Sequence, residues 1–323
     1  MTLAQLLSRR VILITGKGGV GKSAVSASLG LLGARAGKKT LLVELGGQSV
    51  MSTYLGGDRS HYTPTRRGNS LHTITLTPPE CMEEYLTREL HSHRLYKMVF
   101  QNEYVAPFVQ AVPALEDLVY IGKIMDLERA RQNNGQPEWD LIVVDGPPTG
   151  QGLNLLRVPQ AIMDMTRMGP MYKNTRIIHE LITDPARTAV CLVTLAEEMP
   201  VNETVEMYRV LKGEIGVPFG PVFVNEVRRR YFEGEEIDAL ETLTHSFAES
   251  GQGPVDFREK LGALLDATRA IHRRMELEQH QISRLKEHIH LPVVELPRLL
   301  TRLLGPEVLG HLANRLEAGL EHL

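Results

Sequence analysis

One stretch near the N-terminus, "GKGGVGKS" at 16–23, constrains the fold of this chain more than any other. It fits the pattern G-x-x-x-x-G-K-[ST] and follows the buried apolar run "VILIT" at 11–15. Glycines allow backbone angles that other residues resist, so that successive N–H groups can point at phosphate oxygens. The helix expected after the loop adds its positive end. The stretch therefore predicts a phosphate-binding loop between a parallel strand and a helix.

This loop supplies most of the expected contacts with a nucleotide. Lys22 is expected to reach the β- and γ-phosphates, and the Ser23 hydroxyl suits a Mg²⁺ ligand. A glycine-rich turn without a ligand is the alternative, but the expected strand before the loop and helix after it argue against that. The residues predicted to bind the cofactor here are Gly18, Gly19, Val20, Gly21, Lys22, Ser23 and Ala24.

Short apolar runs alternate with helical patterns along the 323 residues. Several runs are rich in Val, Ile and Leu without alternation, as parallel strands covered on both faces should be. We therefore predict an α/β fold, a P-loop NTPase with a doubly wound, mainly parallel sheet of about seven strands. A single domain over 1–323 should carry helical insertions, some on the side that meets a client, at about 78–131, 159–182 and 232–288. The runs lie at 11–15, 40–45, 71–76, 140–144, 188–195, 221–225 and 291–296.

Composition excludes several classes of partner. The net charge of −3, with one short basic run at 228–230, gives no field that would attract nucleic acid. The two cysteines, Cys81 and Cys191, are too few for a structural zinc site or a disulfide framework. No apolar run is long enough to cross a bilayer, and the N-terminus lacks the order of a signal peptide, so a cytoplasmic location is expected.

The run at 140–144 carries Asp145 to the carboxyl end of a predicted strand, the edge where such sheets bind ligands. A carboxylate there can hold a water molecule bound to Mg²⁺. The "GPPTG" turn that follows is stiff and could sense a γ-phosphate. The alternative is an aspartate that caps a helix, and the phosphate loop makes it the weaker interpretation.

Lys17, directly after the first glycine, is typical of deviant Walker A proteins, whose K-G-G-V-G-K-[ST] appears here as "KGGVGKS". This resemblance implies that Lys17 reaches across a two-fold axis to the nucleotide of the partner subunit. A cation in that position stabilises the charge that develops on the transferred phosphoryl group. The active unit would then be a dimer, either of two copies or of this chain and a paralogue. The alternative is a solvated lysine on a turn.

Longer segments resemble the ArsA-like family, the arsenite-pump and tail-anchored-protein-targeting ATPases. "DGPPTGQGLNLLRVP" at 145–159 is similar to the family's D-x-A-P-T-G-H-T-L-R-L-L segment, and "VPALEDLVYIGKIMDL" at 112–127 to the helix before it. "FVNEV" at 223–227 resembles the strand whose asparagine reads the adenine edge, which assigns that role to Asn225. "VVELPRLL" at 293–300 resembles the loop over the base, where Pro297 would pack.

The resemblance implies an ATPase that binds ATP and Mg²⁺ and couples ATP-driven subunit closure to the handling of a partner protein. The chain lacks the cysteine pair through which zinc joins subunits in part of the family, and also the metalloid-binding cysteines, so neither zinc nor arsenite is expected. Four methionines in the segment 163–171 either bind apolar clients or fill the core, and the sequence leaves both open. They are Met163, Met165, Met168 and Met171.

Aligned with the family, "LLVELGGQS" places Gly46 where the switch aspartate that orients the attacking water belongs. Glu44 is assigned to contact with metal-bound water, and Gln48 is either a water-positioning group or a polar loop residue. Losing one orienting group should slow hydrolysis roughly 10²–10⁴-fold without abolishing it. The predicted catalytic residues are Lys17, Lys22, Glu44 and Asp145, and the predicted Mg²⁺ site uses Ser23 directly and Glu44 and Asp145 through water.

A different class of function is a nucleotide-gated scaffold or positioning protein with little turnover, as in the MinD and ParA groups. A leucine stripe near the C-terminus, at 309, 312, 316 and 320, invites a membrane role. Its helix carries three glutamates against Arg315, whereas a membrane-surface helix should be basic. We therefore expect the stripe to pack on the sheet and expect no membrane contact. A reductase of the nitrogenase type is excluded because the chain lacks cysteines for an iron–sulfur cluster.

Overall fold

The computed structural model describes residues 1–47, 50–90, 113–230, 232, 234–250, 254–299 and 305–322. Within these residues eight strands form one sheet in the order β3-β4-β2-β5-β1-β6-β7-β8. All neighbouring strands pair in parallel except β3 and β4. The strands are β1 Val11–Gly16, β2 Thr40–Leu45, β3 Thr65–Arg66, β4 Leu71–Leu76, β5 Leu141–Pro148, β6 Thr188–Leu195, β7 Phe219–Val227 and β8 Val293–Pro297.

The predicted α/β fold is confirmed, and each of the seven predicted runs is a strand. The eighth strand, β3, has only two residues and pairs antiparallel at the edge of the sheet. A run so short shows neither alternation nor an apolar stretch, so no local pattern predicts it.

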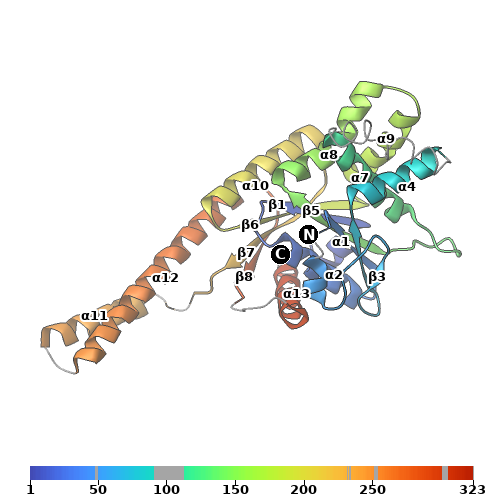
Figure 1. Cartoon of the computed structure of the whole chain (residues 1–323). Coiled ribbons are helices and arrows are strands. Elements are labelled where there is room, and N and C mark those ends of the chain that lie inside the picture. Colours follow the sequence, from blue (N-terminus) through green and yellow to red (C-terminus); the bar gives the residue numbers. More distant parts are fainter. Residues whose placement is uncertain are drawn as a thin grey trace, which may run out of the picture.

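Helices cover both faces of the sheet (Figure 1). One buried cluster joins the sheet to α7, α8, α9 and α10, and another joins its opposite face to α1, α2 and α13. The helices are α1 Leu3–Leu7, α2 Lys22–Arg35, α3 Val50–Leu55, α4 Pro78–Leu90, α7 Pro113–Arg129, α8 Thr149–Thr166, α9 Pro170–Thr183, α10 Glu198–Val210, α11 Gly234–Ser250, α12 Val255–His288 and α13 Pro306–Glu321. Helix α10 continues into a π-helical turn at Leu211–Ile215. Among the described helices, not one is both long and apolar enough to cross a membrane.

Helix α2, which follows the phosphate loop, lies unusually close to the sheet. A Cβ atom on Gly30 would come within 2.7 Å of Leu42, and one on Gly33 within 2.6 Å of Leu141. Helix α13 packs on the outer side of α2 and on β8. The leucine stripe of α13 is buried in this contact, so α2 is enclosed on both sides.

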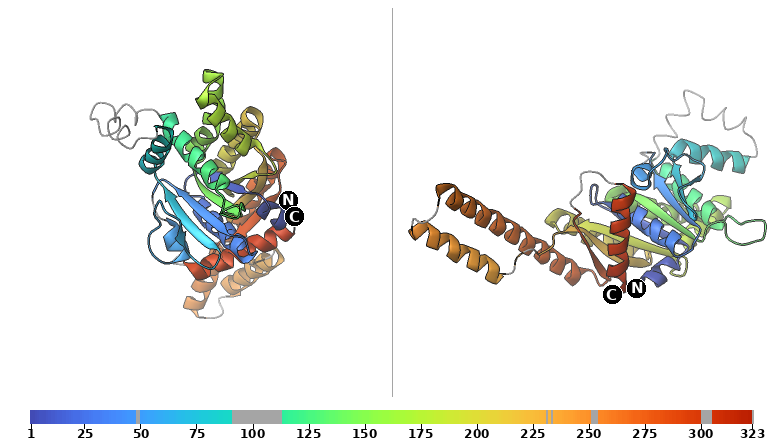
Figure 2. Two further views of the ribbon diagram at one scale, coloured as in Figure 1. Left: turned by 90° about the vertical axis from the view of Figure 1, so that its right-hand side faces the viewer. Right: turned by 90° about the horizontal axis from the view of Figure 1, so that it is seen from below.

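Helix α12 has 34 residues, or about 51 Å at 1.5 Å per residue. Its C-terminal part is anchored, because Ile282 and Leu285 belong to the main buried cluster. Its N-terminal part and α11 project from the body as a helical hairpin, on the side away from α4 (Figures 1 and 2).

Candidate functional site

The phosphate loop joins β1 to α2 and needs glycine at several positions. Gly16, Gly19 and Gly21 have φ of +151°, +83° and +89°, angles that L side chains rarely adopt. Space is a second constraint, since a Cβ on Gly16 would lie 2.1 Å from the carbonyl oxygen of Val193. Gly18 and Gly19 are exposed, so the loop presents its backbone outward.

Lys22 begins α2 and is buried. Its Nζ donates a hydrogen bond to the carbonyl oxygen of Lys17, 2.9 Å away, which bends the side chain back over the loop. Burial lowers the pKa of Lys22, and the nearby charge of Asp145 opposes that shift. The ammonium therefore lies close to the loop backbone, and its contact with phosphates stays a prediction.

Asp145 ends the buried part of β5, and two serines of α2 hold its carboxylate. The Ser23 hydroxyl donates to Oδ2 at 2.6 Å, and the Ser26 hydroxyl donates to Oδ1 at 3.1 Å. Burial raises the pKa of Asp145, while the two serines and Lys22 oppose that shift. The structure brings Ser23 and Asp145 together, and their roles at Mg²⁺ stay predictions. No sequence pattern pointed to Ser26.

Glu44 lies beside Asp145, because the two are paired residues of the neighbouring strands β2 and β5. The backbone N–H of Val50 donates to its Oε1 at 2.6 Å, and the Thr75 hydroxyl donates to its Oε2 at 3.3 Å. Burial raises the pKa of Glu44, and the adjacent Asp145 raises it further. Two carboxylates with raised pKa at one strand edge form a polar centre next to the loop.

These donors suit a magnesium ion. Ser23, Asp145 and Glu44 offer hard oxygen ligands close to the phosphate loop. In the described parts of the chain, no three His, Cys, Asp or Glu side chains gather as a self-sufficient metal site.

A cavity of about 480 Å³ is lined by five of the nine predicted nucleotide residues, and Gly18, Val20, Lys22 and Ser23 are not among its lining residues. This volume lies within the range of small-molecule sites. Loop residues line it on one side, and the ends of β7 and β8 line it on the other. Its lining residues are Gly19, Gly21, Ala24, Tyr54, Asn225, Glu226, Pro297, Arg298, Leu299 and Leu312.

Asn225, predicted to read adenine, also supports the loop. Its Nδ2 donates to the carbonyl oxygen of Val20 at 3.0 Å, and a Cβ on Gly21 would lie 2.2 Å from the same nitrogen. The next residue, Glu226, has φ of +57°, a strained angle for a residue with a side chain. The sequence did not single out Glu226, Tyr54 or Arg298, because nothing local marks them as cavity residues.

Lys17 has a partner in its own chain that the sequence did not suggest. Its Nζ lies 2.5 Å from Oε1 of Glu203 on α10, and both side chains are about one-third exposed, at 31% and 33%. The Thr149 hydroxyl donates to Oε2 of Glu203 at 3.5 Å. Glu203 therefore links the loop lysine to the "GPPTG" turn after β5.

The turn after β2 begins with two glycines that have positive φ. Gly46 and Gly47 have φ of +95° and +78°, and a Cβ on Gly46 would meet nothing within 4 Å. Burial raises the pKa of the Tyr120 phenol, and the nearby backbone of Gly46 opposes that shift. Gln48, the second candidate for positioning water, lies outside the described residues.

The methionines divide between the two predicted alternatives. Met165 and Met168 are 83% and 80% exposed, so these two do not fill the core. Met163 is half-buried, and the side chain of Met171 lies outside the description.

This loop, at the carboxyl edge of a parallel sheet and with Ser23 bonded to Asp145, defines a P-loop NTPase. A family model described as "Anion-transporting ATPase" matches residues 9–169. The chain is 29% identical over 272 residues to ATPase BagA of Mycobacterium tuberculosis, an alignment that covers 82% of this chain and 76% of that protein. These matches support an ArsA-like ATPase family for this chain, and such a family implies ATP binding.

Two more distant relatives cover less of their own length. A protein of Halobacterium salinarum named as an arsenical pump-driving ATPase is 26% identical over 228 residues, which are 67% of this chain and 35% of that protein. ATPase ARSA1 of Chlamydomonas reinhardtii is 24% identical over 283 residues, 70% of this chain and 36% of that protein.

Proposed function

We propose that this ATPase is a dimeric switch that hydrolyses ATP slowly and couples ATP-driven closure of two subunits to the handling of a partner protein. The observation that carries the proposal is the position of Lys17. Its ammonium is partly exposed at the edge of the loop, held by Glu203, where the nucleotide of a second subunit could compete for it. ATP and Mg²⁺ are the expected ligands.

Each residue of the site then has a task in phosphoryl transfer, which depends mainly on position and charge. The loop amides and Lys22 hold the β- and γ-phosphates, and Ser23 with the carboxylates of Asp145 and Glu44 would hold Mg²⁺ and its waters. The bound ion would offset the charge that develops on the phosphates. Lys17 of the partner subunit would complete this compensation in the closed dimer.

Slow hydrolysis is proposed because the turn after β2 lacks the acid that orients water. Glu44, the one carboxylate in 44–47, already accepts hydrogen bonds from Val50 and Thr75. Its geometry suits a role in the metal shell better than a role as a free general base.

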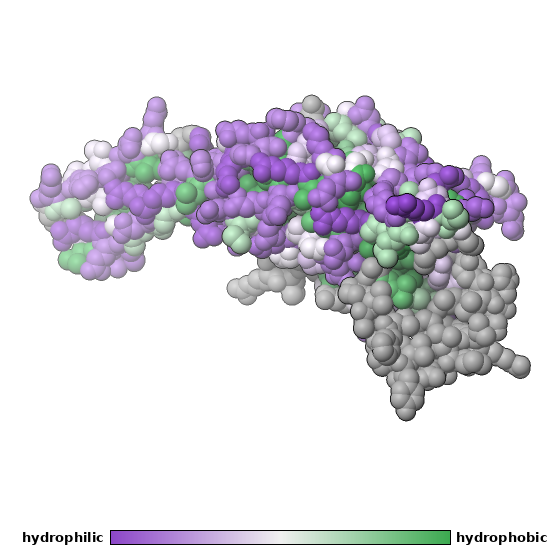
Figure 3. Space-filling model, turned by 90° about the horizontal axis from the view of Figure 1, so that it is seen from above, coloured by the Kyte–Doolittle hydropathy of each residue, from purple (hydrophilic) through white to green (hydrophobic). Residues whose placement is uncertain are grey.

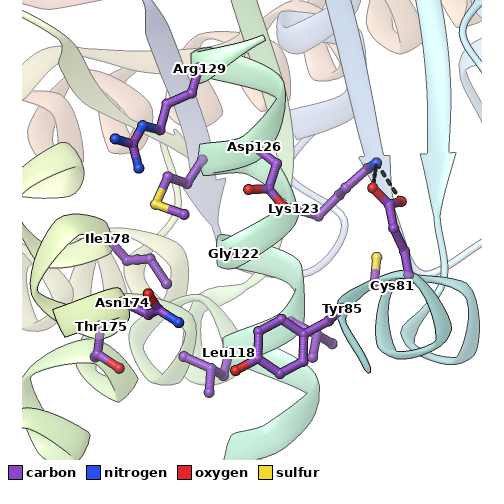
Figure 4. A pocket seen from close by; sticks show the side chains of 13 residues that line it. Cys81, Tyr85, Leu118, Gly122, Lys123, Asp126, Arg129, Asn174, Thr175 and Ile178 are labelled. Carbon is purple, nitrogen blue, oxygen red and sulfur yellow. Dashed lines mark hydrogen bonds and ion pairs between the residues drawn. The ribbon is translucent and has the colours of Figure 1, made fainter. Parts of the chain in front are cut away.

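Partner handling is proposed for the layer of α4, α7, α8 and α9. The exposed Met165 and Met168 lie where α8 ends, and flexible thioethers suit adaptable apolar contacts. A second cavity of about 210 Å³ lies between α4, α7 and α9 and has a Lys123–Glu84 ion pair at its wall (Figure 4). Helix α7 supports the coupling, since it carries Lys123 of this cavity and also Tyr120, whose pKa is raised by burial and lowered in part by the backbone of Gly46.

No comparable observation favours the scaffold alternative. The leucines at 309, 312, 316 and 320, which invited a membrane role, are all buried against α2, the sheet and the rest of that cluster.

ATP turnover of three variants tests the proposal. Lys17→Ala should abolish the activity that exists, because the developing charge loses its partner in trans. Gly46→Asp should raise turnover about tenfold or more, since the position is open and the strain of an aspartate at positive φ is of the order of 1–2 kcal/mol. Gly47→Asp is the control, because it carries a similar strain one residue away. Unchanged turnover in Lys17→Ala and Gly46→Asp would refute this assignment of the chemistry.

A further inference from the structure

The hairpin of α11 and the outer part of α12, residues 234–250 and 254–275 and here named the arm, has little core of its own. Its two helices hold together through the buried Ile237, Leu261 and Leu265. The rings of Phe247 and Phe257 add an edge contact at 5.4 Å near the tip. A hairpin that projects from the body with so little buried surface is half of a typical helical bundle.

Three apolar side chains of α12 form an exposed stripe along the arm. Phe257, Leu264 and Ile271 are 45%, 50% and 40% exposed, and they are spaced seven residues apart. A seven-residue spacing returns to nearly the same side of a helix, which is the pattern of a helix–helix seam. Ala263 and Ala267, also exposed, flank the stripe and would let another helix approach closely. Figure 3 shows apolar residues on the otherwise hydrophilic arm.

The charges beside this stripe are self-complementary. By the helical repeat, Asp256 and Arg274 lie on the same flank of the stripe, because the 18 positions between them are about five full turns of the helix. Laying α12 antiparallel on a second α12, with Leu264 at the centre, brings Phe257 opposite Ile271. It places Asp256 on the same flank as Arg274 of the second copy, about 3 Å from it along the helix axis and within reach of the long arginine side chain. The two-fold axis repeats each pairing. Both charged side chains are available: Asp256 has only a highly exposed contact with Lys260, and Arg274 only a 3.9 Å contact with Glu197.

We propose that the occupant of the stripe is the same stripe of a second copy of this chain, so that two arms form an antiparallel four-helix bundle. This pairing needs no nucleotide. It would keep two copies joined while their ATP sites open and close. It deepens the dimer of the proposed function by assigning a separate contact to it, and it commits to two copies rather than to a paralogue.

The arm also has a direct structural path to the nucleotide site. On α12, Glu278 is buried, accepts a hydrogen bond from the backbone N–H of Arg228 at 3.0 Å and forms an ion pair with the Arg228 side chain. Arg228, Arg274 and Glu278 line a small cavity together with Asn225 and Arg298, which also belong to the nucleotide cavity. A paired arm would therefore be connected, through Arg274 and Glu278, to residues that line the nucleotide cavity.

Cysteine cross-linking of the full-length protein without nucleotide tests the pairing. Leu264→Cys should form a covalent dimer with a short bismaleimide, since each Leu264 would lie next to its symmetry mate. The native cysteines are both buried. Leu277→Cys is the matched control, because Leu277 is 65% exposed on the opposite side of the same helix. Equal cross-linking of both variants, or none of Leu264→Cys, would overturn the proposal.

Analytical ultracentrifugation without ATP gives an independent measurement. Leu264→Glu should weaken the dimer at least tenfold, and Leu277→Glu should not. Asp256→Arg should also weaken it, and the double variant Asp256→Arg with Arg274→Asp should restore it. A wild-type chain that is monomeric without ATP would overturn arm pairing but leave ATP-driven closure standing. Arm dimers that fail to respond to ATP would instead count against the proposed switch alone.

Discussion

Replacing Glu203 by glutamine should make ATP-dependent closure easier. Glu203 holds the ammonium of Lys17 at 2.5 Å. In the proposed closed dimer the lysine would leave Glu203 to reach the nucleotide of the other subunit. Glutamine keeps the shape of the side chain and can still accept the hydrogen bond from Thr149, which is 3.5 Å long. The substitution therefore removes mainly the charge that competes for the lysine.

The size of the effect follows from the exposure of this ion pair. Pairs near the surface contribute about 0.5–1 kcal/mol, and both side chains here are about one-third exposed. A closed dimer breaks two such pairs, so closure should become more favourable by about 1–2 kcal/mol. That is a gain of about 5–30-fold in the association constant measured with nucleotide.

The assay is light scattering during titration with a non-hydrolysable ATP analogue and Mg²⁺. A Leu264→Glu background removes the proposed arm contact, so that only nucleotide-dependent association is measured. Glu206→Gln is the control, because Glu206 is exposed on the same helix and one turn further along. The reasoning is refuted if Glu203→Gln associates no more tightly than this control, or if it also associates more tightly without nucleotide.

Two other predictions concern the loop and a buried acid. Gly21→Ala should weaken nucleotide binding at least a hundredfold, as measured with a fluorescent ATP analogue. The reason is that a Cβ at Gly21 would lie 2.2 Å from the Asn225 side chain, at a φ of +89°. Gly68→Ala is the control and should bind normally, because a Cβ there would meet no atom within 4 Å. Burial, with a smaller contribution from Glu116, raises the pKa of Asp117 from 3.8 to about 6. The protonated Asp117 therefore contributes stability that is fully present below pH 3.8 and is lost as the pH rises through about 6. Asp117→Asn should therefore be more stable than wild type at pH 7, by roughly 1–3 kcal/mol at about 1.4 kcal/mol per pH unit, and the advantage should vanish near pH 4 in thermal unfolding. An advantage that does not depend on pH would contradict this.

Strands and loops that depend only on a few consecutive residues could be predicted from the sequence. A strand buried on both faces must be a short apolar run, so "TLLVEL" and "TAVCLVTL" marked β2 and β6 without reference to the rest of the chain. The phosphate loop was readable for the same reason, because its glycines serve backbone angles set within eight residues.

Contacts between distant segments could not be predicted in this way. Glu203 is 186 positions from Lys17, and a glutamate on an amphipathic helix looks like any solvated charge until α10 is placed beside the loop. Asn225 was assigned to the base by resemblance, but its bond to Val20 depends on the approach of β7 to the loop, which no local pattern contains. The projection of α11 and α12 was equally hidden, since a charged helix reads the same whether it lies on the body or leaves it.

The close packing of α2 on the sheet determines which helices of this protein can move. With Gly30 against Leu42 and Gly33 against Leu141, and with α13 behind it, α2 has no slack for sliding or tilting. The triphosphate end of the nucleotide would thus contact a part of the protein that is fixed to the sheet. In the proposed dimer, movement driven by ATP would therefore fall to the opposite layer of helices and to the second subunit, while the phosphates keep their place.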